Sequence, residues 1–139
     1  MDTSNHHQQQ FTEYFRKKRY QLRTVKGSGH EIAMLDIGEI SYLEADASST
    51  NFIMSNGEKK VSSDNLGHHE DCMAKNLMPF YRIHNCFIVN LFMVDRILKG
   101  ASPKVVLKAE SGERIVLPIS EKYRKRFFDV LGIKQGAGS

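Results

Sequence analysis

Short segments in which apolar and polar residues alternate run through the chain from residue 31 to residue 119. Alternation with a period of two is typical of β-strands that bury one face. Two pairs of these segments are separated by turn residues and predict hairpins, and the first pair has the strong hairpin signal Asn56-Gly57 between its strands. The predicted strands cover residues 31–35, 40–44, 51–54, 59–62, 80–90, 96–99, 104–109 and 114–119.

Three further segments carry apolar residues at the spacing of an α-helix. The middle one, residues 64–77, is expected to begin at a Ser63 or Asp64 cap, to bury its apolar stripe and to point His69 toward solvent. The last one begins after Ser120, a favourable N-cap residue. The three predicted helices cover residues 11–25, 64–77 and 121–131.

These elements predict a mostly β protein with two or three short helices. A length of 139 residues suits one domain with a sizeable core. The domain is expected to span residues 27–133, because the glycine-containing segment 26–29 breaks the pattern before it. Residues 1–26 are expected to form a basic arm or a linker helix, and residues 134–139 a flexible tail.

The formal charge of +4 is concentrated near the N-terminus. Residues 1–26 hold six lysines and arginines against two acids, whereas residues 27–139 hold fourteen residues of each sign. A basic arm ahead of a neutral domain is able to contact phosphates, and it is equally compatible with a solvated linker helix. Charge alone therefore leaves the role of the arm open.

The sequence contains none of the motifs of the common enzyme classes. There is no nucleotide-binding glycine loop, no nucleophile elbow and no His-Glu-x-x-His. Cys72 and Cys86 fit no metal or redox spacing, and adjacent histidines such as His68-His69 fan out around a helix instead of converging. We therefore expect no enzymatic activity, no metal or other cofactor and no small-molecule substrate. No segment is apolar enough to cross a membrane and no signal peptide is visible, so the expected compartment is the cytoplasm.

The most informative segment is Phe80–Asn90, where the polar pair His84-Asn85 interrupts an otherwise well-patterned β segment. Such local inconsistencies often mark functional residues. Both side chains are able to read base edges, since an amide pairs with adenine and an imidazole donates or accepts a hydrogen bond. The alternative is a pair of strand residues satisfied by neighbouring backbone. The residues alone therefore favour a binding module without naming its ligand.

Four sequence blocks, in this order, resemble the LytTR family, the β-rich DNA-binding domains of bacterial LytR/AgrA-type response regulators. The resemblance covers residues 31–131, and the third block is the most distinctive. The blocks are Ile40-x-Tyr42-Leu43-Glu44-Ala45, Leu66 at a helix start, Phe80-x-Arg82-x-His84-Asn85 continuing to Val89-Asn90, and Ile115-x-Leu117-Pro118-Ile119-Ser120-x-x-Tyr123.

The resemblance implies an elongated arrangement of small antiparallel β-sheets that presents loops, not a recognition helix, to the major groove of DNA. Three contact regions are implied: the loop after the opening strand, the His84-Asn85 step, and the turn before the last helix. Asn85 falls on a position at which the family reads a base. The implied DNA-binding residues are Ser48, Ser49, Thr50, Asn51, Arg82, His84, Asn85, Ser120, Glu121, Lys122 and Arg124.

Two positions depart from the family pattern. Cys86 replaces the usual serine, and Glu121 stands where an arginine is common. An acid that faces DNA repels phosphate, although it is able to accept a hydrogen bond from a cytosine amino group. Lys122 or Arg124 is therefore expected to take over the third contact.

The expected function is that of a sequence-specific, DNA-binding transcriptional regulator of a two-component system. The expected partner is double-stranded DNA, and a homodimer on DNA is left open. The alternative is a protein-interaction or sensory β module, which the neutral charge of residues 27–139 keeps in view. Since 26 residues are too few for the receiver domain that usually precedes such domains, the chain is expected to be either a stand-alone regulator or the output domain of a longer protein.

Overall fold

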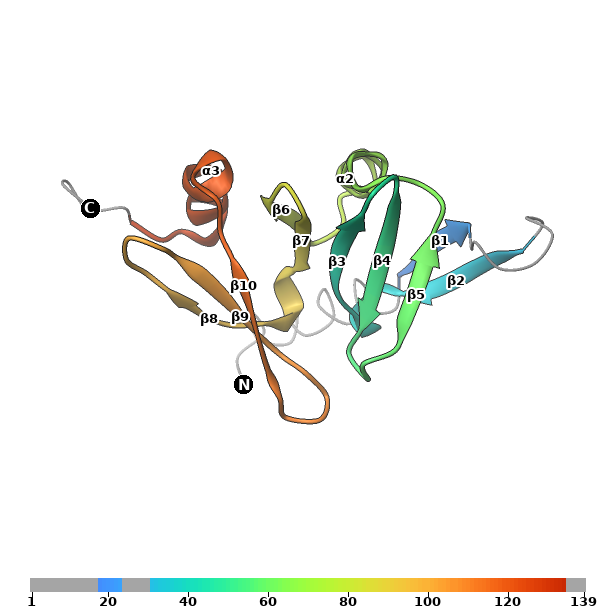
Figure 1. Cartoon of the computed structure of the whole chain (residues 1–139), viewed down its shortest axis with the longest axis horizontal. Coiled ribbons are helices and arrows are strands. Elements are labelled where there is room, and N and C mark those ends of the chain that lie inside the picture. Colours follow the sequence, from blue (N-terminus) through green and yellow to red (C-terminus); the bar gives the residue numbers. More distant parts are fainter. Residues whose placement is uncertain (1–17, 24–30, 135–139) are drawn as a thin grey trace, which may run out of the picture.

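The computed structural model describes residues 18–23 and 31–134. Within these ranges the chain forms three antiparallel sheets that lie side by side along the long axis of the molecule, with two α-helices beside them (Figure 1). The mostly β fold class is therefore confirmed. The strands are β1 (Arg19–Arg23), β2 (Ile32–Asp36), β3 (Ile40–Asp46), β4 (Ser49–Met54), β5 (Lys59–Ser62), β6 (Phe80–His84), β7 (Phe87–Asn90), β8 (Val94–Leu98), β9 (Lys104–Lys108) and β10 (Arg114–Pro118), and the helices are α2 (Leu66–Lys75) and α3 (Glu121–Leu131).

The middle sheet connects the two ends of the molecule. Its strand order is β5-β4-β3-β7-β6, so the β3–β4 and β6–β7 hairpins meet where β3 pairs with β7. The two-stranded sheet is the β1-β2 ladder, and the three-stranded sheet has the order β10-β9-β8. Short 3-10 turns at Ile37–Glu39 and Leu91–Met93 lead from one sheet into the next, since they connect β2 to β3 and β7 to β8.

Two hydrophobic cores hold these layers together. The first core joins β1 and β2 to the middle sheet and α2, and its buried side chains include Leu22, Phe52 and Met73. The second core joins the β6–β7 hairpin to the three-stranded sheet and α3, and it includes Ile83 and Phe127. The β6–β7 hairpin thus lies between α2 and α3, as Figure 1 shows, and it contributes side chains to both cores. No helix among the described residues is long and apolar enough to cross a membrane.

Both predicted hairpins are confirmed, whereas the predicted Ser63 or Asp64 cap of the middle helix is wrong, because Asn65 takes the N-cap position. Gly57 has a φ of 90°, which only glycine adopts without strain, so the Asn56-Gly57 signal does mark the β4–β5 turn. Pro118 lies in β10, an edge strand, where its missing N–H costs no ladder hydrogen bond. Gly132 has a φ of 71° and ends α3 in the left-handed conformation common at helix C-termini.

The helix predicted over residues 11–25 is wrong where the structure describes it. Residues 19–23 form strand β1, in which Tyr20 and Leu22 point into the first core while their neighbours point outward. That pattern has a period of two, and the ladder with β2 decides the outcome because it satisfies the backbone groups along one edge of each strand. Residues 11–17 lie outside the described residues, as does the part of the predicted arm that precedes them.

The segment predicted as one strand over residues 80–90 is a hairpin instead. Strand β6 ends at His84 and β7 begins at Phe87, so Asn85-Cys86 is a two-residue turn and Cys86 is not in a strand. The polar step that interrupts the alternating pattern is therefore a change of chain direction. This turn places Asn85 in solvent, which suits it to binding.

The prediction that His69 points toward solvent is also wrong. The helix begins at Leu66 with Asn65 as its N-cap, since Asn65 Oδ1 accepts a hydrogen bond from the backbone N–H of His68 at 2.8 Å. His69 is only 1% exposed and contacts the hydroxyls of Tyr20 and Ser62, at 2.6 and 2.8 Å. The side chain turns inward because strand β1 and the middle sheet supply two polar partners for it.

Candidate nucleic-acid interface

The three regions implied as DNA contacts lie along one edge of the molecule. In Figure 1 this is the upper edge, which carries the β3–β4 turn, the β6–β7 turn and α3. Two backbone hydrogen bonds join them: Ala45 N–H donates to the carbonyl of Cys86 at 2.8 Å, and Ser120 N–H donates to the carbonyl of Ile83 at 2.9 Å. The regions are therefore parts of one continuous, hydrogen-bonded surface, which we call the upper edge.

The first region is smaller than the loop over residues 48–51 that the resemblance implies. The chain reverses in a two-residue turn of Ala47, with a φ of 54°, and Ser48, and β4 already begins at Ser49. Thr50 and Asn51 are buried in β4, where Thr50 Oγ1 donates to the backbone carbonyl of Asp64 at 2.8 Å. Of the four residues implied here, Ser48 is exposed and Ser49 half-buried, while Thr50 and Asn51 support the turn from inside the sheet.

The second region presents two polar side chains at the tip of the β6–β7 hairpin. Asn85 is exposed, and none of the hydrogen bonds among the described residues uses its side-chain amide. His84 Nδ1 accepts a hydrogen bond from the backbone N–H of Cys86 at 3.1 Å. Because a backbone N–H only donates, Nδ1 carries no proton in this arrangement and the ring presents Nε2–H as a donor. The tip therefore offers a complete amide and one imidazole N–H.

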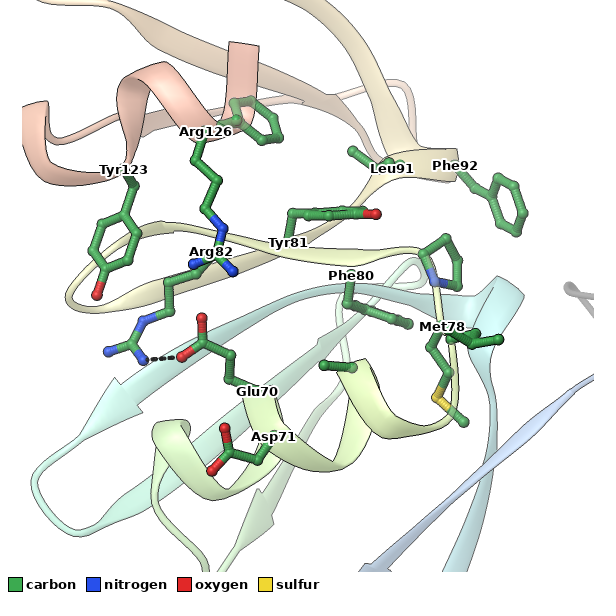
Figure 2. A pocket seen from close by; sticks show the side chains of 14 residues that line it. Glu70, Asp71, Met78, Phe80, Tyr81, Arg82, Leu91, Phe92, Tyr123 and Arg126 are labelled. Atoms are coloured by element: carbon green, nitrogen blue, oxygen red, sulfur yellow. Dashed lines mark hydrogen bonds and ion pairs between the residues drawn. The ribbon is translucent and has the colours of Figure 1, made fainter. Parts of the chain in front are cut away.

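Arg82 does not point to the same solvent-exposed surface. Its side chain is only 15% exposed, and its guanidinium donates to the backbone carbonyls of His84 and Asn85, at 3.0 and 2.8 Å. It also donates to Glu70 Oε1 of α2 at 2.9 Å (Figure 2). The aromatic ring of Tyr123 lies 5.6 Å from the guanidinium carbon. The implied contact residue Arg82 is therefore engaged within the protein.

The third region begins at Ser120, the N-cap of α3. Its hydroxyl makes no capping hydrogen bond, although its backbone carbonyl accepts from Tyr123 and Arg124. The Glu121 side chain is 85% exposed, and Lys122 is also exposed. Arg124 is only 16% exposed and lies 5.8 Å from the ring of Phe128, so Lys122, not Arg124, is the accessible cation of this turn.

Ion pairs within the domain engage part of the positive charge near the N-terminus. Residues 1–17 carry two bases and two acids, so the entire excess of four belongs to residues 18–26, which contain no acid. In this segment Arg19 pairs with Asp36 at 3.2 Å and Arg23 pairs with Asp64 at 2.7 Å. The hydrogen bond from Arg23 holds the pKa of the Asp64 carboxyl below its usual range. Two of the four cations in this segment are thus paired with acids of the domain.

Glu70 is the functional candidate that the sequence analysis missed. It lies on α2, twelve residues before Arg82, and it lines a groove of about 670 Å³ between α2, β6 and α3 (Figure 2). Its only sequence signal is an acid on a helix face, which is usually solvated. The pairing becomes visible only when α2 is packed beside β6. Among the described residues, no group of three histidines, cysteines or acids is placed to hold a metal ion.

Three small antiparallel sheets in a row, with polar turns gathered on one edge, suit a nucleic-acid-binding module. The comparison with known families is in agreement. A family model described as the LytTr DNA-binding domain matches residues 30–132, and the chain belongs to this family. The family is non-catalytic, which agrees with the expectation that the chain is not an enzyme.

A solved structure supports the same assignment. The chain is similar to a structure from Bacillus cereus, with a TM-score of 0.62 and 26% sequence identity over 84% of this chain and 99% of that one. That structure is described as the LytTr DNA-binding domain of a putative methyl-accepting/DNA response regulator. No curated protein matches the chain. The chain therefore has the fold and family of a DNA-binding domain.

Proposed function

We propose that this protein is a sequence-specific transcriptional regulator that reads the major groove of double-stranded DNA with its upper edge. The observation that carries this proposal is the Asn85 amide, exposed at the tip of the β6–β7 hairpin with no partner among the described residues. An unoccupied amide is able to make a bidentate pair with an adenine edge. The neighbouring His84 Nε2–H suits an acceptor on a flanking base.

We assign different roles to the other implied residues. Ser48, Ser49 and Lys122 are proposed to contact backbone phosphates, because hydroxyl and ammonium groups serve this purpose and carry little sequence information. The buried or engaged side chains hold these contacts in position instead. This supporting set is Thr50, Asn51, Arg82, Ser120 and Arg124. Site of action in the cytoplasm, a role in a two-component system and a homodimer on DNA remain predictions.

Selection from a random duplex library tests the proposal, because the selection itself identifies the sequence that the protein prefers. The expected result is enrichment of a short motif, followed by a gel shift in which the selected duplex binds at least about 1000-fold more tightly than a scrambled one, as is typical of specific DNA binding. If no motif is enriched and both duplexes bind alike, the protein-interaction or sensory module becomes the better interpretation.

Deletion of residues 1–17 is expected to leave the salt dependence of DNA binding unchanged. These residues have no net charge, and the slope of log affinity against log salt reports the number of neutralised phosphates, at about 0.9 per phosphate. Titrations of the full chain and the truncated chain over a range of about 50–200 mM salt measure this slope. A slope shallower by one or more would instead show that the arm contacts phosphates. The deletion stops before residue 18 because β1 belongs to the first core.

Glu121→Arg is expected to tighten DNA binding and to lower thermal stability slightly. An acid at a helix N-terminus is favourable by about 0.3–1 kcal/mol, and the arginine loses this contribution and places like charge beside Arg124. On the upper edge the same change replaces a charge that repels phosphate with one that attracts it. Glu113→Arg, in the β9–β10 hairpin at the opposite edge of Figure 1, is the matched control. Equal effects of both substitutions at low salt would remove the α3 turn from the interface.

A further inference from the structure

We propose that Glu70 and Arg82 are positioning residues for DNA reading: Glu70 orients the Arg82 guanidinium, and Arg82 holds the β6–β7 turn so that Asn85 is presented to the base edge. This inference rests on the proposed function and names residues that act without touching DNA. The two side chains connect α2, the β6–β7 hairpin and α3 at one point, as Figure 2 shows.

The first argument is that the β6–β7 turn lacks the features that normally make a two-residue turn stable by itself. Two-residue hairpin turns prefer conformations with positive φ, which explains their usual glycines. Asn85 and Cys86 are not glycine, and neither is among the described residues with positive φ. The ladder is also irregular here, with a register shift between Arg82 and His84. This turn therefore depends on hydrogen bonds from outside its own backbone.

Arg82 supplies these hydrogen bonds. Two of its N–H groups donate to the two consecutive turn carbonyls, those of His84 and Asn85. Fixing both carbonyls fixes the two peptide planes that flank the Asn85 Cα, and hence the direction in which the Asn85 side chain leaves the backbone. A guanidinium is planar and its donors point in fixed directions, so it is suited to hold several acceptors at once. A lysine has the same charge but cannot reproduce this geometry.

Glu70 accepts a hydrogen bond from the third nitrogen of the same guanidinium, Nη1, and so fixes its orientation. The carboxylate lies 2.9 Å from Nη1, and the two side chains are 33% and 15% exposed. A largely buried cation is costly without a carboxylate partner, so loss of Glu70 favours rotation of Arg82 toward solvent. On the other side the Tyr123 ring, 5.6 Å away, limits where the guanidinium is able to move. The acid of α2 therefore controls the turn through Arg82.

The adjacent acid Asp71 provides a matched control. Asp71 is exposed on the same helix, lines the same groove and takes part in none of the ion pairs among the described residues. Simple electrostatics predicts that removal of either negative charge slightly tightens DNA binding. The positioning role predicts opposite signs. Glu70→Gln should weaken binding to the selected duplex by roughly 5- to 50-fold, a part of the discrimination that a bidentate base contact provides, whereas Asp71→Asn should tighten it or leave it unchanged.

Arg82→Lys completes the test. It should lower specific affinity as Glu70→Gln does, with an unchanged salt slope, and the double variant should be no weaker than either single one because both act through one contact. Tightening by Glu70→Gln equal to that by Asp71→Asn would overturn the proposal.

A DNA-free measurement separates this inference from the proposed function. In backbone NMR spectra of the free protein, Glu70→Gln and Arg82→Lys should shift the amide signals of residues 84–86 in the same direction, and Asp71→Asn should leave them unchanged. Signals that do not move in either variant refute the positioning role, whatever the DNA results. If these signals move while the wild-type protein selects no DNA motif, the proposed function fails and the structural coupling stands.

Discussion

Asn85→Ala is expected to weaken binding to the selected duplex by roughly 5- to 150-fold and to leave binding to scrambled DNA nearly unchanged, since a bidentate amide–base pair contributes about 1–3 kcal/mol of discrimination. The physical reason is that the substitution removes both the donor and the acceptor at the tip of the β6–β7 hairpin. The backbone of the turn stays in place because Arg82 contacts carbonyls and not the Asn85 side chain.

Fluorescence anisotropy with the two duplexes measures this discrimination directly. Asn56→Ala is the matched control, because Asn56 is also an exposed turn asparagine but lies in the β4–β5 turn, away from the upper edge (Figure 1). It should cost neither specific nor non-specific affinity. An equal loss of affinity for both duplexes in Asn85→Ala would mean that Asn85 contacts a phosphate and not a base. Unchanged thermal stability would show that the variant is folded.

The sheets could be predicted largely because their sequence signals are local. A strand with one buried face requires alternating residues, and a tight turn requires residues such as Asn56-Gly57, so both are visible within a few positions. The β6–β7 turn was harder to predict because it lacks such residues. Its conformation depends on Arg82, whose bonds to the turn carbonyls are visible only in three dimensions. A turn that is stabilised by a side chain outside it needs no characteristic turn residues, so its sequence looks like that of one continuous strand.

The candidate site could be predicted by region but not by residue. The order of motif blocks located all three parts of the upper edge, yet motif position does not state whether a side chain is exposed. Thr50 and Asn51 are buried because β4 begins earlier than the polar run suggests. The basic arm was misjudged because its ion pairs are not visible in the sequence. Arg19 and Arg23 were expected to be unpaired, but they bind acids that lie 17 and 41 residues further along the chain. Net charge therefore overstated what is available to DNA.

The buried histidine predicts a second large effect, a loss of stability in mild acid. Burial lowers the pKa of His69 from 6.5 to about 4, with a smaller contribution from nearby His68. The folded state therefore keeps the ring neutral, with its two nitrogens in hydrogen bonds with the hydroxyls of Tyr20 and Ser62. The unfolded chain binds a proton below about pH 6.5. Between about pH 6.5 and 4 the unfolded state holds more protons, and the free energy of unfolding falls as the pH falls.

The size of this loss follows from the two pKa values. Each unit of difference corresponds to about 1.4 kcal/mol, so the contribution of His69 is fully present above about pH 6.5 and about 3 kcal/mol smaller near pH 4. Urea unfolding of the wild-type protein and of His69→Gln, measured from about pH 7.5 to pH 4, gives the free energy of unfolding of each. The difference between the two isolates the contribution of His69, because the titration of the carboxylates is common to both proteins. The variant should be less stable at neutral pH, because glutamine replaces the hydrogen bonds to Tyr20 and Ser62 imperfectly, and the difference between the two proteins should shrink toward pH 4.

A wild-type curve that stays parallel to the His69→Gln curve over the whole range would show that His69 is not the acid-sensitive group. The convergent result would mean that His69, which lies on α2 and contacts β1 and the middle sheet, limits the pH range in which these elements stay packed together, because protonation places a charge in a buried site.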